Sequence, residues 1–269
     1  MRSRLNLMIL TRPLSRAIGF PILLLTVHAA SAATLVATVG DSFADGIYLA
    51  LRSRPDLLQK YDIQVTRWSH PVIGLARSDY FDYPAWLQSS PKVGAADFCI
   101  VQIGSNDMQG IPAGGKNRWI VYGSEPWKAA YKSRVQDVWQ ILSHGRCKEI
   151  LWILQPGFEK RAFMARNRGL INQLQSEALT SAGAKLFDLH TTGSEYGRDD
   201  VHFNRDFVLA LGGAVVRTVV FSRQAQQANC AACHGGVAGR NALLHRDISP
   251  LDLLPSRPLV SLAVPPPGR

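Results

Sequence analysis

Four short polar motifs, far apart in the chain, carry residues whose types fit one kind of chemistry. They are Gly40-Asp41-Ser42, Gly74, Gly104-Ser105-Asn106-Asp107 and Asp199-x-x-His202. A serine hydroxyl becomes a useful nucleophile when a base accepts its proton, and histidine suits that task near neutral pH. A carboxylate bonded to the second ring nitrogen holds the imidazole in one tautomer. Ser42, His202 and Asp199 are therefore the candidate nucleophile, base and orienting acid.

The remaining motifs offer hydrogen-bond donors. Serine attack on an ester builds negative charge on the carbonyl oxygen, and this charge needs preorganised donors. The candidates are the side-chain amide of Asn106 and the backbone N–H groups of Gly74 and Ser42. A glycine at position 74 lets the backbone approach a bound substrate closely. These three residues are the predicted oxyanion hole.

Each motif also has a purely structural interpretation. Gly40-Asp41-Ser42 suits the cap of a following helix, since Asp and Ser are favoured there, and Asn106-Asp107 is typical of a simple Asx turn. In the structural interpretation, Asp199, Asp200 and Asn204 are turn and capping residues. His202 is then an exposed side chain without a catalytic role. His190 is a rival base, although its place at a predicted strand end favours a structural role. We favour the catalytic interpretation, because chance would otherwise have to bring all these motifs together in a mechanistically sensible order.

Short apolar runs alternate with longer amphipathic stretches, and together they predict the elements that position the motifs. The runs are nearly continuous, as expected for strands covered on both faces, and they span residues 34–40, 62–69, 97–104, 149–155 and 184–190. Helical patterns lie at about residues 43–54, 79–89, 125–144, 163–181 and 206–223. This alternation predicts an α/β fold, a flavodoxin-like three-layer α/β/α sandwich with a five-stranded parallel sheet. The motifs then meet at the carboxyl edge of that sheet.

In this order the four motifs resemble those of the SGNH, or GDSL-like, hydrolases, over roughly residues 34–223. The stretch GLARSDYFDYPAW, residues 74–86, is also similar to a branch of exported bacterial members of poorly defined function. Phe43 departs from the leucine of the longer GDSL motif. Asp200 leaves two choices for the acid, and the i, i+3 spacing to the histidine favours Asp199.

The resemblance implies a serine esterase with Ser42 as nucleophile, His202 as base and Asp199 as its partner. It implies that Ser42, Gly74 and Asn106 form the oxyanion hole, with no cofactor required for hydrolysis. The expected substrates are small acyl esters, with acetyl groups on an envelope or extracellular glycan as one class. The alternatives are an O-acyltransferase that uses the same triad, and a haem-bearing redox or binding protein whose SGNH-like domain is not catalytic.

Four aromatic residues follow the asparagine motif: Trp119, Tyr122, Trp127 and Tyr131. They are candidates to line an acyl or sugar site. Aromatic residues at helical spacing more often belong to the core, which is the competing interpretation.

The first 32 residues have the features of an export signal. Four arginines precede the apolar run AIGFPILLLTV, and the small residues of HAASAA follow, with a cleavage site after Ala32. A run of about 11 residues is short for a membrane span, which takes about 20. An uncleaved anchor is the alternative, and it would be the protein's attachment to a membrane. We therefore expect a periplasmic or extracellular protein with its hydrolase domain at residues 33–223.

Removing the four arginines of that signal from the formal charge of +10 leaves about +6. This mildly basic charge is compatible with an anionic envelope polymer as a partner, but a solvated surface with more Arg than Glu is the favoured interpretation. No run of Lys and Arg with interleaved aromatics indicates a nucleic-acid partner.

Residues 224–269 are predicted to be an irregular tail, because five prolines lie in the last 15 residues. This tail contains Cys230, Cys233 and His234, the spacing of a c-type haem attachment site. Only 35 residues follow His234, and no methionine follows Met164 to serve as an iron ligand. A local disulfide and a free dithiol are the alternatives.

The other two cysteines are Cys99 and Cys147, each near the start of a predicted strand. A disulfide between them is compatible with export, but a buried free Cys99 is the favoured expectation.

Overall fold

A computed structural model describes residues 33–114, 118–189 and 191–234, with side chains up to residue 225. Five parallel strands form the central sheet in the order β2-β1-β3-β6-β7. Their bounds are β1 (Thr34–Gly40), β2 (Ile63–Ser69), β3 (Ala96–Gln102), β6 (Cys147–Ile153) and β7 (Lys185–Phe187). In the parallel register Gly40 lies beside Ser69 and Gln102, so the first three strands end level with one another. This is the flavodoxin-like order, and the predicted five-stranded parallel sheet is confirmed.

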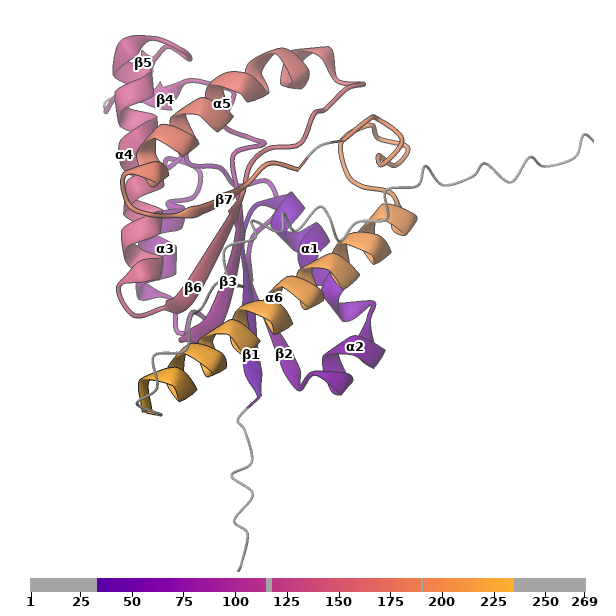
Figure 1. Cartoon of the computed structure of the whole chain (residues 1–269). Coiled ribbons are helices and arrows are strands. Elements are labelled where there is room, and N and C mark those ends of the chain that lie inside the picture. Colours follow the sequence, from indigo (N-terminus) through magenta and orange to yellow (C-terminus); the bar gives the residue numbers. More distant parts are fainter. Residues whose placement is uncertain (1–32, 115–117, 190, 235–269) are drawn as a thin grey trace, which may run out of the picture. The chain divides into compact units, whose positions relative to one another are not determined.

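Helices cover both faces of the sheet (Figure 1). On one face lie α1 (Ser42–Arg52) and α6 (Arg205–His234), and on the other lie α3 (Tyr83–Ser89), α4 (Glu125–Ser143) and α5 (Ala162–Thr180). Strand residues pack against helices on both sides, so neighbours such as Val36 and Ala37 are both fully buried although they face opposite layers. This burial explains why the strands are apolar throughout rather than alternating.

Four elements differ from the sequence-based expectation. A short helix, α2 (Pro55–Lys60), follows α1, and the two-residue strands β4 (Ile111–Pro112) and β5 (Trp119–Ile120) pair in an antiparallel manner. Such short elements leave no periodic pattern to detect. The last helix was predicted to end near residue 223, but α6 continues to His234. Its added residues are rich in Ala and Gln, which favour helix, and the first glycine after them is Gly235.

Within the described ranges, no helix has both the length and the apolar character that crossing a bilayer would require.

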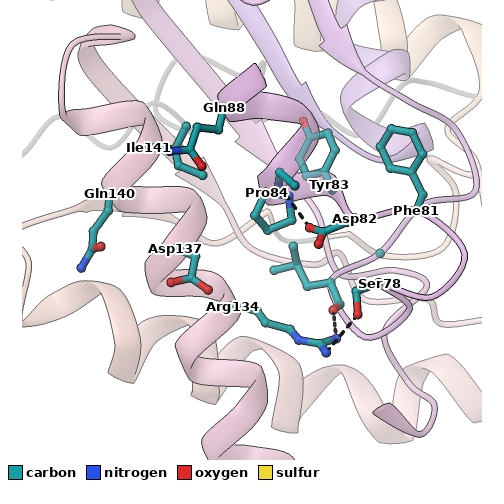
Figure 2. A pocket seen from close by; sticks show the side chains of 13 residues that line it. Ser78, Phe81, Asp82, Tyr83, Pro84, Gln88, Arg134, Asp137, Gln140 and Ile141 are labelled. Carbon is teal, nitrogen blue, oxygen red and sulfur yellow. Dashed lines mark hydrogen bonds between the residues drawn. The ribbon is translucent and has the colours of Figure 1, made fainter. Parts of the chain in front are cut away.

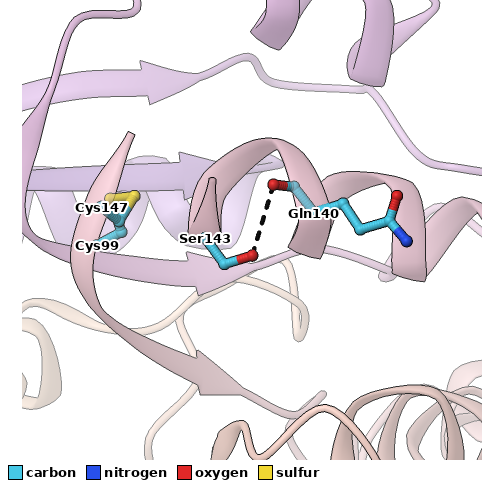
Figure 3. The surroundings of a disulfide bond; sticks show 4 residues. All are labelled: Cys99, Gln140, Ser143 and Cys147. Carbon is cyan, nitrogen blue, oxygen red and sulfur yellow. Dashed lines mark hydrogen bonds between the residues drawn. A yellow bond between two sulfur atoms is a disulfide. The ribbon is translucent and has the colours of Figure 1, made fainter. Parts of the chain in front are cut away.

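Cys99 and Cys147 form a disulfide that links β3 to β6, with 5.7 Å between their Cα atoms (Figure 3). The expectation of a free buried Cys99 was therefore wrong. Both cysteines are buried, at 0% and 7% exposure, and their Cα separation falls in the range that a disulfide needs. Sequence spacing could not reveal this, because the two cysteines are 48 residues apart and the side-chain directions depend on the sheet.

Candidate active site

The turn after β1 presents Ser42 at the carboxyl edge of the sheet. Gly40 has a φ of +133°, and a side chain at that position would collide with the carbonyl group of Gln102 on the neighbouring strand. The turn therefore requires glycine. Asp41 caps α1 by accepting a hydrogen bond from the N–H of Phe43 at 2.9 Å. The capping interpretation thus holds for Asp41, while Ser42 begins the helix.

Asp41 also joins the first motif to the third. Its buried carboxylate accepts hydrogen bonds from the N–H groups of Gly104 and Ser105, at 3.0 and 3.1 Å, and from the Ser105 hydroxyl at 2.7 Å. Burial raises the pKa of Asp41, and these hydrogen bonds oppose the rise. The carboxylate thus holds the two turns at a fixed separation.

The side chains of Ser42, His202 and Asp199 form a continuous chain of hydrogen-bonding contacts. His202 Nε2 is 3.1 Å from Ser42 Oγ, and His202 Nδ1 is 2.6 Å from Asp199 Oδ2. Asp199 Oδ1 also accepts the N–H groups of Val201 and His202. Burial alone would raise the pKa of Asp199, but the bond to His202 and the two backbone N–H groups outweigh it and lower the pKa to about 2. The group is therefore a carboxylate at neutral pH.

The rival residues lie elsewhere. Asp200 adopts a left-handed φ of 56°, and its carboxylate lies 3.4 Å from Lys160 Nζ. Asn204 accepts the N–H of Phe207 in the first turn of α6, so the structure bears out its capping role. His190 lies outside the described residues.

The candidate oxyanion residues Gly74 and Asn106 pack against each other. A side chain at position 74 would run into the carboxylate of Asp107 and the Cβ of Asn106. The Asn106 side-chain amide donates to the carbonyl oxygen of Ile73 at 2.8 Å, and Asp107 accepts the N–H of Ala76 at 2.8 Å. The two motifs are therefore held together by reciprocal contacts across Gly74. Their role as oxyanion donors stays a prediction.

Asp107 is fully buried below this loop. Burial raises its pKa to about 6, against the opposing hydrogen bonds from backbone N–H groups and from the Tyr131 hydroxyl. Tyr131 Oη lies 3.1 Å from Asp107 Oδ2 and also accepts a bond from Gln175 Nε2. The loop that carries Gly74 thus rests on a buried polar network. Sequence reasoning assigned no such role to Tyr131.

Arg134 supports the same loop from outside. A hollow of about 450 Å³ lies between α3 and α4, and Gly74 belongs to its lining (Figure 2). There the Arg134 guanidinium donates to the carbonyl oxygen of Leu75 at 2.5 Å and to Ser78 Oγ at 3.2 Å. Burial lowers the pKa of Arg134. No local sequence signal could have found this residue, because its contacts are 56 and 59 positions away.

The four aromatic candidates divide between core and surface. Trp127 and Tyr131 are fully buried and stack on each other, with ring centroids 4.9 Å apart. Trp119 is 48% exposed, with the Arg77 guanidinium 5.1 Å from its ring centroid. Tyr122 is half-buried and bonds the carbonyl oxygen of Asn167 at 3.3 Å. The core interpretation holds for the first pair.

Among the residues that the structure describes, no group of three or more His, Cys, Asp or Glu side chains could hold a metal ion. Cys230, Cys233 and His234 lie on the last turns of α6, and their side chains are outside the described part. Haem attachment at this motif stays a prediction.

The strand order and the meeting of the four motifs at one sheet edge define an SGNH-hydrolase fold. The chain belongs to the DUF459 family, described as a protein of unknown function, whose family model matches residues 35–203.

Several solved structures are similar to this chain. The lipase/acylhydrolase from Enterococcus faecalis has a TM-score of 0.50 and 16% identity, covering 71% of this chain and 96% of that chain. The acetylxylan esterase Axe2 from Geobacillus stearothermophilus has a TM-score of 0.47 and 14% identity, covering 72% and 94%. An aryl esterase from M. smegmatis has a TM-score of 0.48 and 14% identity, covering 70% of this chain and 98% of that chain. At such identities the likeness establishes the fold alone, and no curated protein matches the chain in sequence.

Proposed function

We propose that this protein is a serine esterase that removes short acyl groups from envelope or extracellular glycans through an acyl-enzyme on Ser42. The observation that carries the proposal is the sequence of contacts from Ser42 Oγ to His202 Nε2 and from His202 Nδ1 to Asp199. The likeness in fold to a lipase/acylhydrolase supports it at the level of reaction class.

The geometry supports the following steps. His202 Nε2 accepts the Ser42 proton as the oxygen attacks the ester carbonyl, while the Asp199 carboxylate holds the Nδ1–H and stabilises the imidazolium. The imidazolium then protonates the leaving alcohol as the ester bond breaks, which leaves an acyl group on Ser42. His202 then takes a proton from water as the water oxygen attacks this acyl group. The imidazolium returns the proton to Ser42 Oγ as the acyl–oxygen bond breaks and the carboxylic acid departs. The backbone N–H groups of Ser42 and Gly74 and the side-chain amide of Asn106 are proposed to donate to the oxyanion in both half-reactions.

The exposure of the triad favours a substrate that covers the site from outside. The side chains of His202 and Asp199 are 51% and 50% exposed, so the substrate itself must cover them to exclude water. A surface of this kind suits an acyl group presented on a polymer better than a free ester buried whole. A protein exported as this signal predicts would meet such glycans.

The test uses the full exported chain with a panel of nitrophenyl esters of increasing acyl length and with acetylated glycans. The control variant is Ser53→Ala, which changes a serine at the other end of α1. Wild type and this control should both hydrolyse the shortest esters fastest. Ser42→Ala should lose at least about 10³-fold in kcat, since removing a triad member has effects of this order or larger. Its melting temperature should match that of the control, because the hydroxyl lies at an open turn.

A fluorophosphonate should add mass to the peptide that contains Ser42 and not to other serine peptides. Labelling of a different serine would refute the assignment. Faster acyl transfer to a sugar hydroxyl than to water would instead make the protein an O-acyltransferase with the same nucleophile.

A further inference from the structure

Five consecutive residues of the loop between β6 and α5 each contact the segment that carries Asp199 and His202. We name this loop, Gly157–Arg161, the positioning loop. The facing segment, residues 191–204, contains no helix or strand of regular length. An isolated bridge between Tyr196 and Phe203 closes the turn that carries Asp199 and His202. Neither Asp199 nor His202 lies on a helix as Ser42 does, so contacts from outside the segment help to fix the turn.

The first three residues of the positioning loop hold the start of the facing segment. The N–H of Gly157 donates to Thr191 Oγ1 at 2.9 Å, and the Thr191 hydroxyl donates to Glu159 Oε1 at 2.8 Å. The N–H of Phe158 donates to the Tyr196 hydroxyl at 2.9 Å. These bonds anchor the facing segment before it reaches the acid.

The last two residues hold the turn that carries the acid itself. Arg161 donates from Nε and Nη2 to the carbonyl oxygen of Asp199, at 3.1 and 2.5 Å. Lys160 Nζ lies 3.4 Å from Asp200 Oδ1. A guanidinium that forms two bonds to one carbonyl group fixes the Asp199 backbone in direction as well as distance.

Phe158 extends the same support toward the nucleophile. It is fully buried and has a φ of +56°, a conformation that a bulky side chain adopts only when its surroundings impose it. Its ring lies edge-on to Phe43, the residue after Ser42, at 5.6 Å, and the Phe43 ring lies 5.7 Å from that of His202. The positioning loop therefore contacts Phe43, the residue next to Ser42, as well as the segment that carries His202.

We propose that the positioning loop holds Asp199 and His202 in line with Ser42, with Arg161 as a positioning residue that fixes the Asp199 backbone. This inference rests on the proposed function. A small displacement of a catalytic group is costly, since a misplacement of about 1 Å can cost about 10²-fold in rate. Removing the guanidinium should therefore slow catalysis without weakening substrate binding.

The first measurement is steady-state kinetics on Arg161→Met, with Arg166→Met as the matched control. Arg166 is an exposed arginine of α5. Arg161→Met should lower kcat about tenfold with KM unchanged, while the control keeps wild-type values. Arg161→Lys, which retains one donor group, should recover part of the loss. Equal kcat in Arg161→Met and the control would refute the positioning role, as would a loss that appears only in KM.

The second measurement needs no substrate. The proton between His202 Nδ1 and Asp199 should give a downfield ¹H NMR resonance in wild type, assigned by its absence in His202→Gln. We expect it to shift or broaden in Arg161→Met and to persist in Arg166→Met. If no ester is hydrolysed but this resonance responds to Arg161→Met, the proposed function fails and the positioning role stands. If esters are hydrolysed and the resonance is unchanged in Arg161→Met, the positioning role fails alone.

Discussion

At the scale of single residues, two neighbouring aspartates have different surroundings. The Asp199 carboxylate contacts the His202 ring and two backbone N–H groups, whereas Asp200 turns away in a left-handed conformation toward Lys160. The exposed pair formed by Asp200 contributes little stability. The difference lies in backbone direction, because the two side chains are chemically identical.

This difference predicts the effect of matched substitutions. Asp199→Asn should lower kcat by on the order of 10²–10⁴-fold, because an amide facing Nδ1 favours the wrong imidazole tautomer. Asp200→Asn should cost a few-fold at most. Both variants should keep the wild-type circular dichroism spectrum. If Asp200→Asn is the damaging change and Asp199→Asn is benign, the acid has been assigned to the wrong residue.

The residues found from sequence are those whose type alone implies chemistry. The types of Ser42, Asp199 and His202 make them candidates for a nucleophile, an acid and a base, and the structure brings their side chains together. Arg134 and Arg161 could not be found in this way. Each donates to a backbone carbonyl group, which every residue possesses, so the partner leaves no signature in the sequence.

At the scale of elements, strand β3, helix α4 and the loop after β2 meet at the buried carboxylate of Asp107. It follows β3, bonds the Tyr131 hydroxyl of α4 and accepts the N–H of Ala76 in the loop after β2. Helix and strand patterns predicted the larger elements, because their length and apolar spacing repeat. They did not predict this contact point, since it depends on a hydroxyl group 24 residues away and a backbone N–H group 31 residues away in sequence.

The raised pKa of Asp107 predicts that the stability of the fold depends on pH. Its pKa is about 6 in the folded state against 3.8 ordinarily, so the folded protein binds this proton more tightly. The favourable contribution is present below about pH 4 and is lost as the pH rises through 6. At 1.36 kcal/mol per pKa unit, the change is on the order of 3 kcal/mol.

Urea unfolding of Asp107→Asn and wild type between pH 4 and 7.5 measures this effect. The variant should gain stability relative to wild type as the pH rises, because an amide does not ionise. Asp137→Asn, an exposed residue of α4, serves as the control and should show a constant difference. A constant difference for Asp107→Asn as well would mean that this carboxyl group titrates normally.

At the scale of the whole molecule, the site and the cysteine-histidine motif lie toward opposite ends of α6. The helix begins at Arg205, directly after the segment with His202, and ends at His234 (Figure 1). Cys230 comes 25 residues after Arg205, which at 1.5 Å per residue is about 37 Å along the axis. A group attached at that end is too far away to touch an ester bound at Ser42.

This separation predicts that hydrolysis is independent of the motif. Cys230→Ala/Cys233→Ala should retain wild-type kcat and KM on the shortest ester, and a marked loss would contradict the separation of the two sites.

The wild type and this double variant, exported from cells that contain the haem-attachment machinery, decide the chemistry of the motif. A Soret band that survives acid-acetone extraction of the wild type and disappears in the double variant would establish covalent haem. Colourless wild type with its two thiols bridged would make the motif a local disulfide, because a bridge occupies the sulfurs that the haem vinyl groups require.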